Sequence, residues 1–203
     1  MKHLFIITQC QYTLKGINCV LQENDSGIEV HIVQSPWEII RFVSQGIPAK
    51  DCVVLIVLYS LNARARTHAL WFAWTFHRLL CDYIHLRAIS RFIMAEPSET
   101  PAACRFWTRI CPGSSVSQFR DFMMSAMQSD AISHYPANAY KLRITPREKQ
   151  VLAHIQNGVS DEIGANQLHV SRTVFSLFRT SLIKKLGLKS RFDFAWLHGM
   201  EFR

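Results

Sequence analysis

The sequence predicts a two-domain protein, in which an α/β domain is followed by a smaller all-α domain. Over about the first 128 residues, short β-branched apolar runs alternate with segments of helical spacing, whereas the last 63 residues contain only helical patterns. Composition divides the chain in the same way. All six cysteines lie at or before residue 111, and residues 141–203 carry +6 of the net charge of +8.

A polar segment separates the two regions. Residues 129–140, with the sequence SDAISHYPANAY, contain one proline and no apolar period, which is typical of a linker. We therefore expect an N-terminal domain over residues 1–128, a linker over residues 129–140 and a C-terminal domain over residues 141–203. With 203 residues, 49% of them apolar, the chain is long enough for both domains to bury a core.

The cellular setting follows from cysteine use and hydropathy. The six cysteines form no CxxC pair, and the N-terminal apolar stretch is too short for a signal peptide. The longest apolar runs fall well short of the roughly 20 residues that span a bilayer. We expect a protein of the reducing cytoplasm with no transmembrane segment.

The apolar runs of the N-terminal region are typical of strands buried on both faces of a parallel sheet. Strands are predicted at residues 4–7, 29–33, 52–58, 90–95 and 106–110, and helices at residues 12–22, 37–44, 64–80 and 116–127. The order β-α-β-α-β-α-β-β-α implies an open sheet with right-handed crossovers. Ligands of such sheets bind at the carboxyl ends of the strands.

Four aromatic residues, Trp71, Phe72, Trp74 and Phe76, fall within one predicted helix. They cannot all face the same side of a helix. Either part of this set forms a dimer surface, or all four pack into the core of a small domain.

The element order and the stretch Leu14-Lys15-Gly16-Ile17 resemble the receiver domain of response regulators. That resemblance implies two acidic residues after the first strand for Mg²⁺, an aspartate in the third strand that accepts phosphate, and a lysine after the fifth. Here these positions are Thr8 and Gln9, Val57, and Cys111. The resemblance therefore implies a degenerate receiver, a pseudoreceiver that is inert toward phosphotransfer.

Helix signals follow one another closely in the C-terminal region. Thr145-Pro146-Arg147-Glu148 is a capping box that starts a helix, and Gly158 ends it. Ser160 caps a second helix, Asp161–Leu168, and Ser171 caps a third, Arg172–Leu186, which Gly187 ends. The short helix, the turn at residues 169–171 and the longer basic helix predict a helix-turn-helix.

The third helix has two different faces. A buried stripe is predicted from Phe175, Phe178, Leu182 and Leu186. The opposite face has short side chains in its middle and cations at its ends, so it can approach base edges while its flanks hold phosphates. A solvated amphipathic helix is the alternative, but the capped context and the +6 charge favour DNA binding.

Residues 141–198 resemble the DNA-binding domain of the LuxR/NarL/FixJ family at ungapped spacing. The matching residues are 144–148, 151–152, 158–160, 165, 168, 170–171, 185–187 and 190–191. The resemblance implies a four-helix domain in which Ser176, Leu177 and Thr180 face bases and Lys184 and Lys189 lie near phosphates. It also implies that the fourth helix, residues 191–198, mediates dimerisation. The predicted DNA-binding residues are Arg172, Thr173, Ser176, Leu177, Arg179, Thr180, Lys184, Lys185 and Lys189.

Two departures from the family pattern affect these expectations. Gly164 lies inside the second helix, where it costs about 0.5–1 kcal/mol relative to alanine. Ser176 replaces a lysine at the centre of the reading face, so we expect weaker stand-alone affinity.

No enzyme motif is present: the sequence has no GxSxG, Walker loop or HExxH, and no cofactor is expected. His154, His169 and His198 have no ligand partners at metal spacing, and Cys104 and Cys111 are interpreted as free thiols.

The sequence therefore predicts a bacterial transcription regulator that binds promoter DNA without phosphorylation. It would act as a homodimer or with another LuxR-type regulator, as the resemblance to auxiliary regulators of the RcsA type implies. The alternative is an interaction protein that sequesters a partner regulator without reading DNA.

Overall fold

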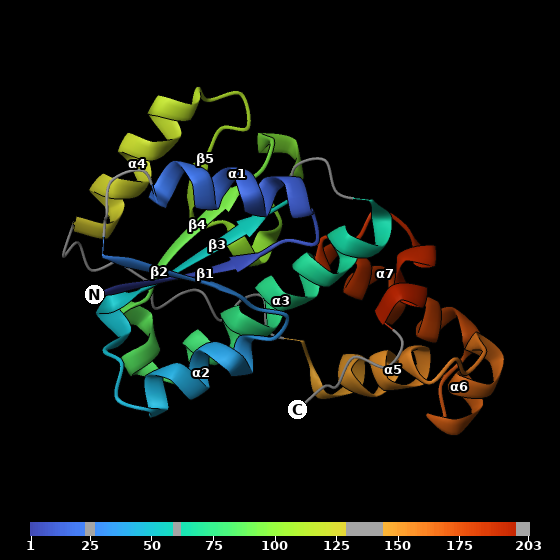
Figure 1. Ribbon diagram of the computed structural model, residues 1–203. Helices are drawn as coiled ribbons and strands as arrows, with labels where there is room; N and C mark the ends of the chain where they lie inside the picture. The colour runs from blue at the N-terminus through green and yellow to red at the C-terminus, as the bar shows by residue number, and fades with distance from the viewer. Residues whose placement is uncertain (23–26, 59–61, 129–143, 198–203) are drawn as a thin grey trace.

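A computed structural model of the chain describes residues 1–22, 27–58, 62–128 and 144–197. The predicted linker and His198 lie outside the described residues. In the N-terminal domain five parallel strands form one sheet in the order β2-β1-β3-β4-β5 (Figure 1). The strands are β1 (Lys2–Ile7), β2 (Ile28–Ile32), β3 (Cys52–Val57), β4 (Ser90–Met94) and β5 (Thr108–Ile110). The predicted open parallel sheet is confirmed.

Burial along the strands follows the sheet order. Every residue of β3 is buried, and so is β1 from its second residue on, because both strands have neighbours on either side and helices on both faces. The edge strand β2 contains no fully buried residue. Continuous apolar runs thus marked β1 and β3, whereas apolar and polar residues alternate along the edge strand β2.

Four helices cover the two faces of this sheet. Helices α1 (Gln11–Gln22) and α4 (Val116–Gln128) lie on one face, and α2 (Pro36–Ser44) and α3 (Ala63–Asp82) lie on the other (Figure 1). Residues 95–107, all of which the structure describes, contain two short 3₁₀ turns and no α-helix between β4 and β5. The turns are η3 (Pro97–Glu99) and η4 (Ala102–Cys104). The predicted succession of two strands is therefore correct.

Helix α3 is buried on nearly all sides. Trp71, Phe72, Trp74 and Phe76 are at most 8% exposed, so none of them forms an open dimer surface. One side of the helix packs on the sheet, and the other packs against the C-terminal segment η6 (Arg191–Leu197). A helix with buried residues on nearly all of its sides requires such a two-sided environment. The second interpretation of the aromatic set is the correct one, with a core that extends across both domains.

The C-terminal domain consists of α5 (Pro146–Gln156), α6 (Asp161–Gln167), α7 (Arg172–Leu186) and η6. Its fourth helix is a 3₁₀ helix over the described residues rather than an α-helix. Gly187, at the end of α7, has a φ of 71° and lies against Pro101, the residue before η4. A side chain there would meet both the left-handed backbone penalty and the neighbouring domain. In the part of the chain that the structure describes, no helix is both long and apolar enough to span a bilayer.

Candidate nucleic-acid interface

Local hydrogen bonds position the two helices of the helix-turn-helix. The Ser160 hydroxyl accepts from the backbone N–H of Ile163 at the start of α6, and the Ser171 hydroxyl accepts from that of Val174 at the start of α7. Between the helices, His169 has a φ of 53°, in the left-handed region that non-glycine residues seldom adopt. The chain thus turns sharply enough to bring α7 across α6.

The two predicted faces of α7 are present. Phe175, Leu182 and Leu186 are buried, and Phe178 is half-buried against the same core. On the other side five of the predicted DNA-binding residues are exposed to solvent: Arg172, Thr173, Leu177, Thr180 and Lys184. Ser176 is half-buried between them. The exposed face stays open while the C-terminal end of α7 contacts the N-terminal domain.

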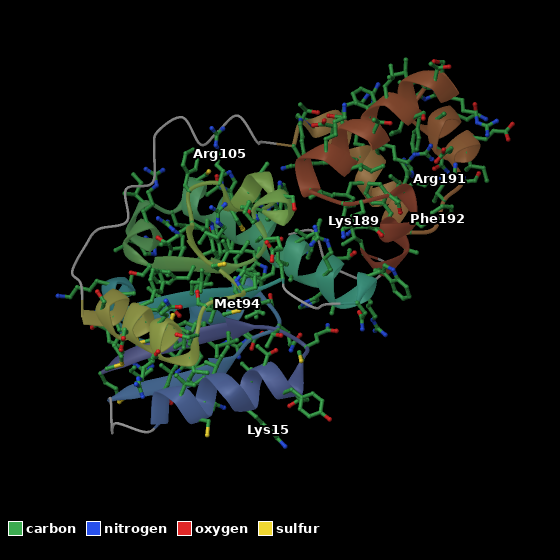
Figure 2. The ribbon with its side chains drawn as sticks, turned by 90° about the horizontal axis from the view of Figure 1, so that it is seen from above. Lys15, Met94, Arg105, Lys189, Arg191 and Phe192 are labelled. Carbon is green, nitrogen blue, oxygen red and sulfur yellow. The ribbon has the colours of Figure 1, made fainter. Side chains whose placement is uncertain are left out.

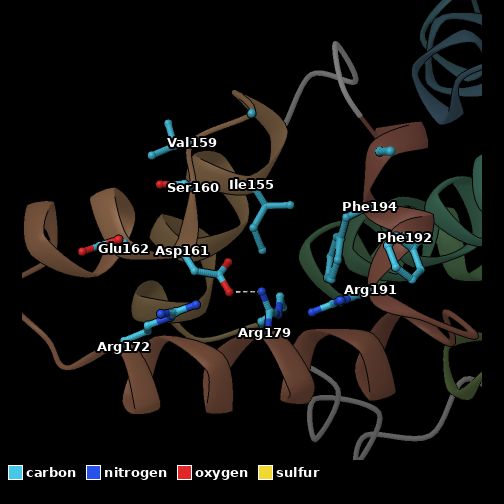
Figure 3. A pocket seen from close by; sticks show the side chains of 12 residues that line it. Ile155, Val159, Ser160, Asp161, Glu162, Arg172, Arg179, Arg191, Phe192 and Phe194 are labelled. Carbon is cyan, nitrogen blue, oxygen red and sulfur yellow. Dashed lines mark hydrogen bonds and ion pairs between the residues drawn. The ribbon is translucent and has the colours of Figure 1, made fainter.

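Arg179 joins α7 to α6. Its guanidinium forms an ion pair with Asp161 in the first turn of α6 (Figure 3). It also donates a hydrogen bond to the Ser176 hydroxyl at 3.3 Å. A guanidinium held in this way is half-buried and keeps α7 at a fixed angle to α6. Arg179 therefore supports the predicted reading face as well as contributing charge to it.

Lys185 has a different environment from its neighbour Lys184. Its ammonium donates to both carboxylate oxygens of Glu148, at 2.8 and 2.7 Å, and the Glu148 side chain is only 4% exposed. The Ser181 hydroxyl and the Thr145 backbone N–H also donate to this carboxylate, each at 2.7 Å. Lys185 thus neutralises a buried carboxylate at the junction of α5 and α7, whereas Lys184 is exposed.

The hydrogen bonds to Glu148 control its titration. Burial acts to raise the pKa of the carboxyl, but the donors Lys185, Thr145 and Ser181 outweigh it and lower the pKa to about 2. Glu148 is therefore ionised throughout the physiological range. The capping box identified in the sequence is both a helix start and half of a buried ion pair.

An open groove of about 480 Å³ adjoins the reading face (Figure 3). Its walls include Arg172 and Arg179 of α7 and Arg191 of η6. Arg191 is exposed and lies on the C-terminal domain beside the predicted phosphate contact Lys189, which is also exposed (Figure 2). Sequence reasoning did not include Arg191 among the DNA-binding residues, although Ser190-Arg191 was part of the family pattern.

The four positions that the receiver resemblance singles out lie at the carboxyl edge of the sheet. Thr8 and Gln9 follow β1 directly, Val57 is the last residue of β3, and Cys111 follows β5. Thr8 is buried and its hydroxyl accepts from the Cys10 backbone N–H at 3.2 Å. Val57 is 1% exposed within the apolar core beneath α1 and α4. Cys111 is exposed and Cys104 is buried, and both are free thiols.

Comparison with known proteins assigns the C-terminal region. Residues 143–197 match the family described as bacterial regulatory proteins, luxR family. The C-terminal domain is a LuxR-type helix-turn-helix domain. In this LuxR-type domain α6, the turn at His169 and α7 form the helix-turn-helix, and the fold predicted from the capping residues is confirmed.

Over nearly its whole length the chain is similar in fold to a solved structure of RcsB. RcsB from Salmonella enterica serovar Typhimurium, bound to promoter P1flhDC in the presence of the phosphomimetic BeF3-, has a TM-score of 0.51 at 15% identity, over 98% of this chain and 99% of that one. Full-length FixJ from B. japonicum has a TM-score of 0.41 at 14% identity, over 97% and 95%. No curated protein matches the chain. The α/β domain is thus receiver-like in fold and precedes a LuxR-type domain.

Proposed function

We propose that this protein is a cytoplasmic transcriptional regulator that binds double-stranded promoter DNA through α7. The observation that carries the proposal is the exposed face of α7 on a LuxR-type domain. Arg172 and Lys184 lie at the two ends of that face, where cations meet phosphates. Between them Thr180 and Leu177 reach outward, and the side chain of Leu177 is 64% exposed. An apolar side chain in this position suits contact with a thymine methyl group.

The proposed regulator acts without phosphorylation. Support comes from the carboxyl edge of the sheet, where Val57 takes the place of a phosphoacceptor and is packed in the core. Thr8 and Gln9 offer no carboxylate to a divalent cation, and Cys111 cannot replace a lysine ammonium. Control of activity would then depend on the amount of protein or on its partner.

The proposed regulator works as a homodimer or with another LuxR-type regulator. The segment that the family resemblance associates with dimerisation carries two exposed aromatic side chains, Phe192 at 70% and Trp196 at 44%. Exposed aromatic residues of this size are typical of contact surfaces. The opposite side of the same segment, including Phe194 and Leu197, is buried. One segment can therefore contact α3 and a second protein at once.

Binding to DNA is expected to depend steeply on salt and on the cations of α7. We expect Arg172→Ala/Lys184→Ala to weaken binding to promoter fragments at least about tenfold and to reduce the slope of log K against log salt by about 2, because each lost phosphate contact removes about 0.9. Fluorescence anisotropy from low to high salt, alone and with candidate partner regulators, measures both quantities.

The matched control is Lys15→Ala/Arg41→Ala, which removes two exposed cations from the N-terminal domain. This control should leave the slope unchanged. A salt-independent signal, or equal losses in both double variants, would contradict DNA recognition by α7 and favour the partner-sequestering alternative.

Phosphodonors are expected to leave the protein unmodified. Incubation with acetyl phosphate and Mg²⁺ should give an unchanged intact mass and unchanged DNA affinity, because residues 53–58 contain no aspartate. A phosphorylatable response regulator treated in parallel provides the positive control. Appearance of an acid-stable mass increase of one phosphoryl group that hydroxylamine removes would identify an aspartyl phosphate and overturn this part of the proposal.

A further inference from the structure

Two histidines and a glutamate lie close together on the face of the sheet that α2 covers, beside the edge strand β2. His3 lies on β1 and is paired in register with Glu29 on β2, while His31 lies two residues further along β2, opposite Phe5. Residues two apart on a strand point to the same face, so parallel pairing brings all three side chains together. His3 and His31 are 9% and 14% exposed at their side chains, and Glu29 is 50% exposed.

We propose that His3, Glu29 and His31 form a binding site for a divalent transition-metal ion of the zinc class. The three donor atoms are His3 Nδ1, His31 Nε2 and Glu29 Oε2. His3 Nδ1 lies 3.1 Å from His31 Nε2 and 3.3 Å from Glu29 Oε2. The distance between His31 Nε2 and Glu29 Oε2 is 3.7 Å. Ligands about 2.0–2.1 Å from a tetrahedral ion are separated from one another by about 3.3–3.4 Å. The three atoms thus have the spacing of one face of a tetrahedron.

The donor types select the ion. Imidazole nitrogens with one carboxylate suit zinc, copper or nickel, whereas magnesium and calcium take mainly oxygen ligands. Among the residues that the structure describes, this is the one group of three or more histidine, cysteine or acidic side chains with donor atoms close enough for a common ion. Because Glu29 is half exposed, solvent reaches this side of the cluster and water supplies the fourth ligand.

Neighbouring aromatic rings hold the His31 imidazole in place. Phe5 stacks on it with centroids 5.0 Å apart and planes at 22°, and Phe42 of α2 lies 4.6 Å away on a tilted plane. Without an ion, the two imidazole rings share one hydrogen bond. An ion bound to both nitrogens would take the place of that proton, which moves to the other nitrogen of the ring that carried it or to solvent.

The proposed ion would link the edge strand β2 to the central strand β1. It lies away from the degenerate receiver positions, which follow the carboxyl ends of β1, β3 and β5, and away from the LuxR-type domain. Its expected effect is stabilisation of the N-terminal domain, because any ligand that binds only the folded state shifts the unfolding equilibrium.

Cobalt is the probe for the test, because tetrahedral Co²⁺ absorbs in the visible range. Full-length protein without a polyhistidine tag should bind one equivalent of Co²⁺, with no thiolate charge-transfer band, and Zn²⁺ should displace it and raise Tm. Glu29→Gln and His31→Gln should each raise the Kd at least about tenfold, and Zn²⁺ should no longer raise Tm. His85→Gln, at an exposed histidine of η2 (Ile84–Ala88), is the control and should leave binding unchanged.

Glu29→Gln keeps the test decisive even if a histidine variant fails to fold, because its side chain is half exposed. Absence of saturable Co²⁺ binding by the wild-type protein would overturn the proposal. Undiminished binding by folded Glu29→Gln would do the same, since it would mean adventitious coordination by other histidines or cysteines.

Discussion

Replacing Glu148 by glutamine is expected to lower the free energy of unfolding by about 3 kcal/mol. Glutamine has the shape of a protonated glutamate, so the substitution removes the charge and leaves Lys185 without its carboxylate. The pKa of Glu148 falls from an ordinary 4.5 to about 2 on folding, and each unit corresponds to about 1.4 kcal/mol. Urea unfolding followed by circular dichroism at pH 7 measures the loss.

Glu162→Gln is the matched control, because Glu162 is exposed in the first turn of α6 and contributes less than about 1 kcal/mol there. The difference between wild type and Glu148→Gln also has a defined pH dependence. A carboxyl with a lowered folded-state pKa contributes stability that is complete above the unfolded value of 4.5 and is lost as the pH falls toward 2. The two proteins should converge in stability near pH 2. Equal small losses in both glutamine variants, or a difference that persists near pH 2, would contradict the buried ion pair.

Gly164→Ala is expected to lower the free energy of unfolding by about 2 kcal/mol, opposite in sign to the effect that helix propensity predicts. A Cβ at this position would lie 2.8 Å from Cε2 and 2.9 Å from Cζ of Phe175. The Phe175 ring is fully buried and cannot move away without disturbing the α6–α7 contact. Forcing extra atoms into such a contact costs about 1–3 kcal/mol, more than the roughly 1 kcal/mol that alanine gains in an isolated helix.

Gly16→Ala is the matched control, because Gly16 lies inside α1 and a Cβ there has no neighbour within 4 Å. It should stabilise the protein by about 0.5–1 kcal/mol. A second comparison measures the free energy of unfolding of the double variant Gly164→Ala/Phe175→Leu. The double variant should lose less than the sum of the two single losses, since the smaller side chain relieves the clash. Stabilisation by Gly164→Ala would show that α6 and α7 separate without cost.

The sequence by itself determined those parts of the fold that depend on neighbours within a few residues. Thr145, Ser160 and Ser171 each accept from a backbone N–H three residues later, and Gly187 takes the left-handed conformation at the end of α7. Capping signals of this kind depend only on residues within one helical turn. The sequence therefore predicted the ends of α5, α6 and α7 to within about a residue. Continuous apolar runs likewise identified the buried strands β1 and β3 before the sheet was known.

Only the tertiary structure decided which distant side chains meet. Glycine at position 164 destabilises an isolated helix, but in the folded protein the Phe175 ring leaves no space for a Cβ there. Residue spacing shows neither the pairing of Glu148 with Lys185 nor that of Arg179 with Asp161, because each pair joins two helices whose crossing depends on the whole core. The sequence left open whether the aromatic residues of α3 are buried or form a dimer surface. They are buried because η6 covers the side of α3 that faces away from the sheet. His3 meets Glu29 and His31 through the register of β1 with β2, which sheet formation sets.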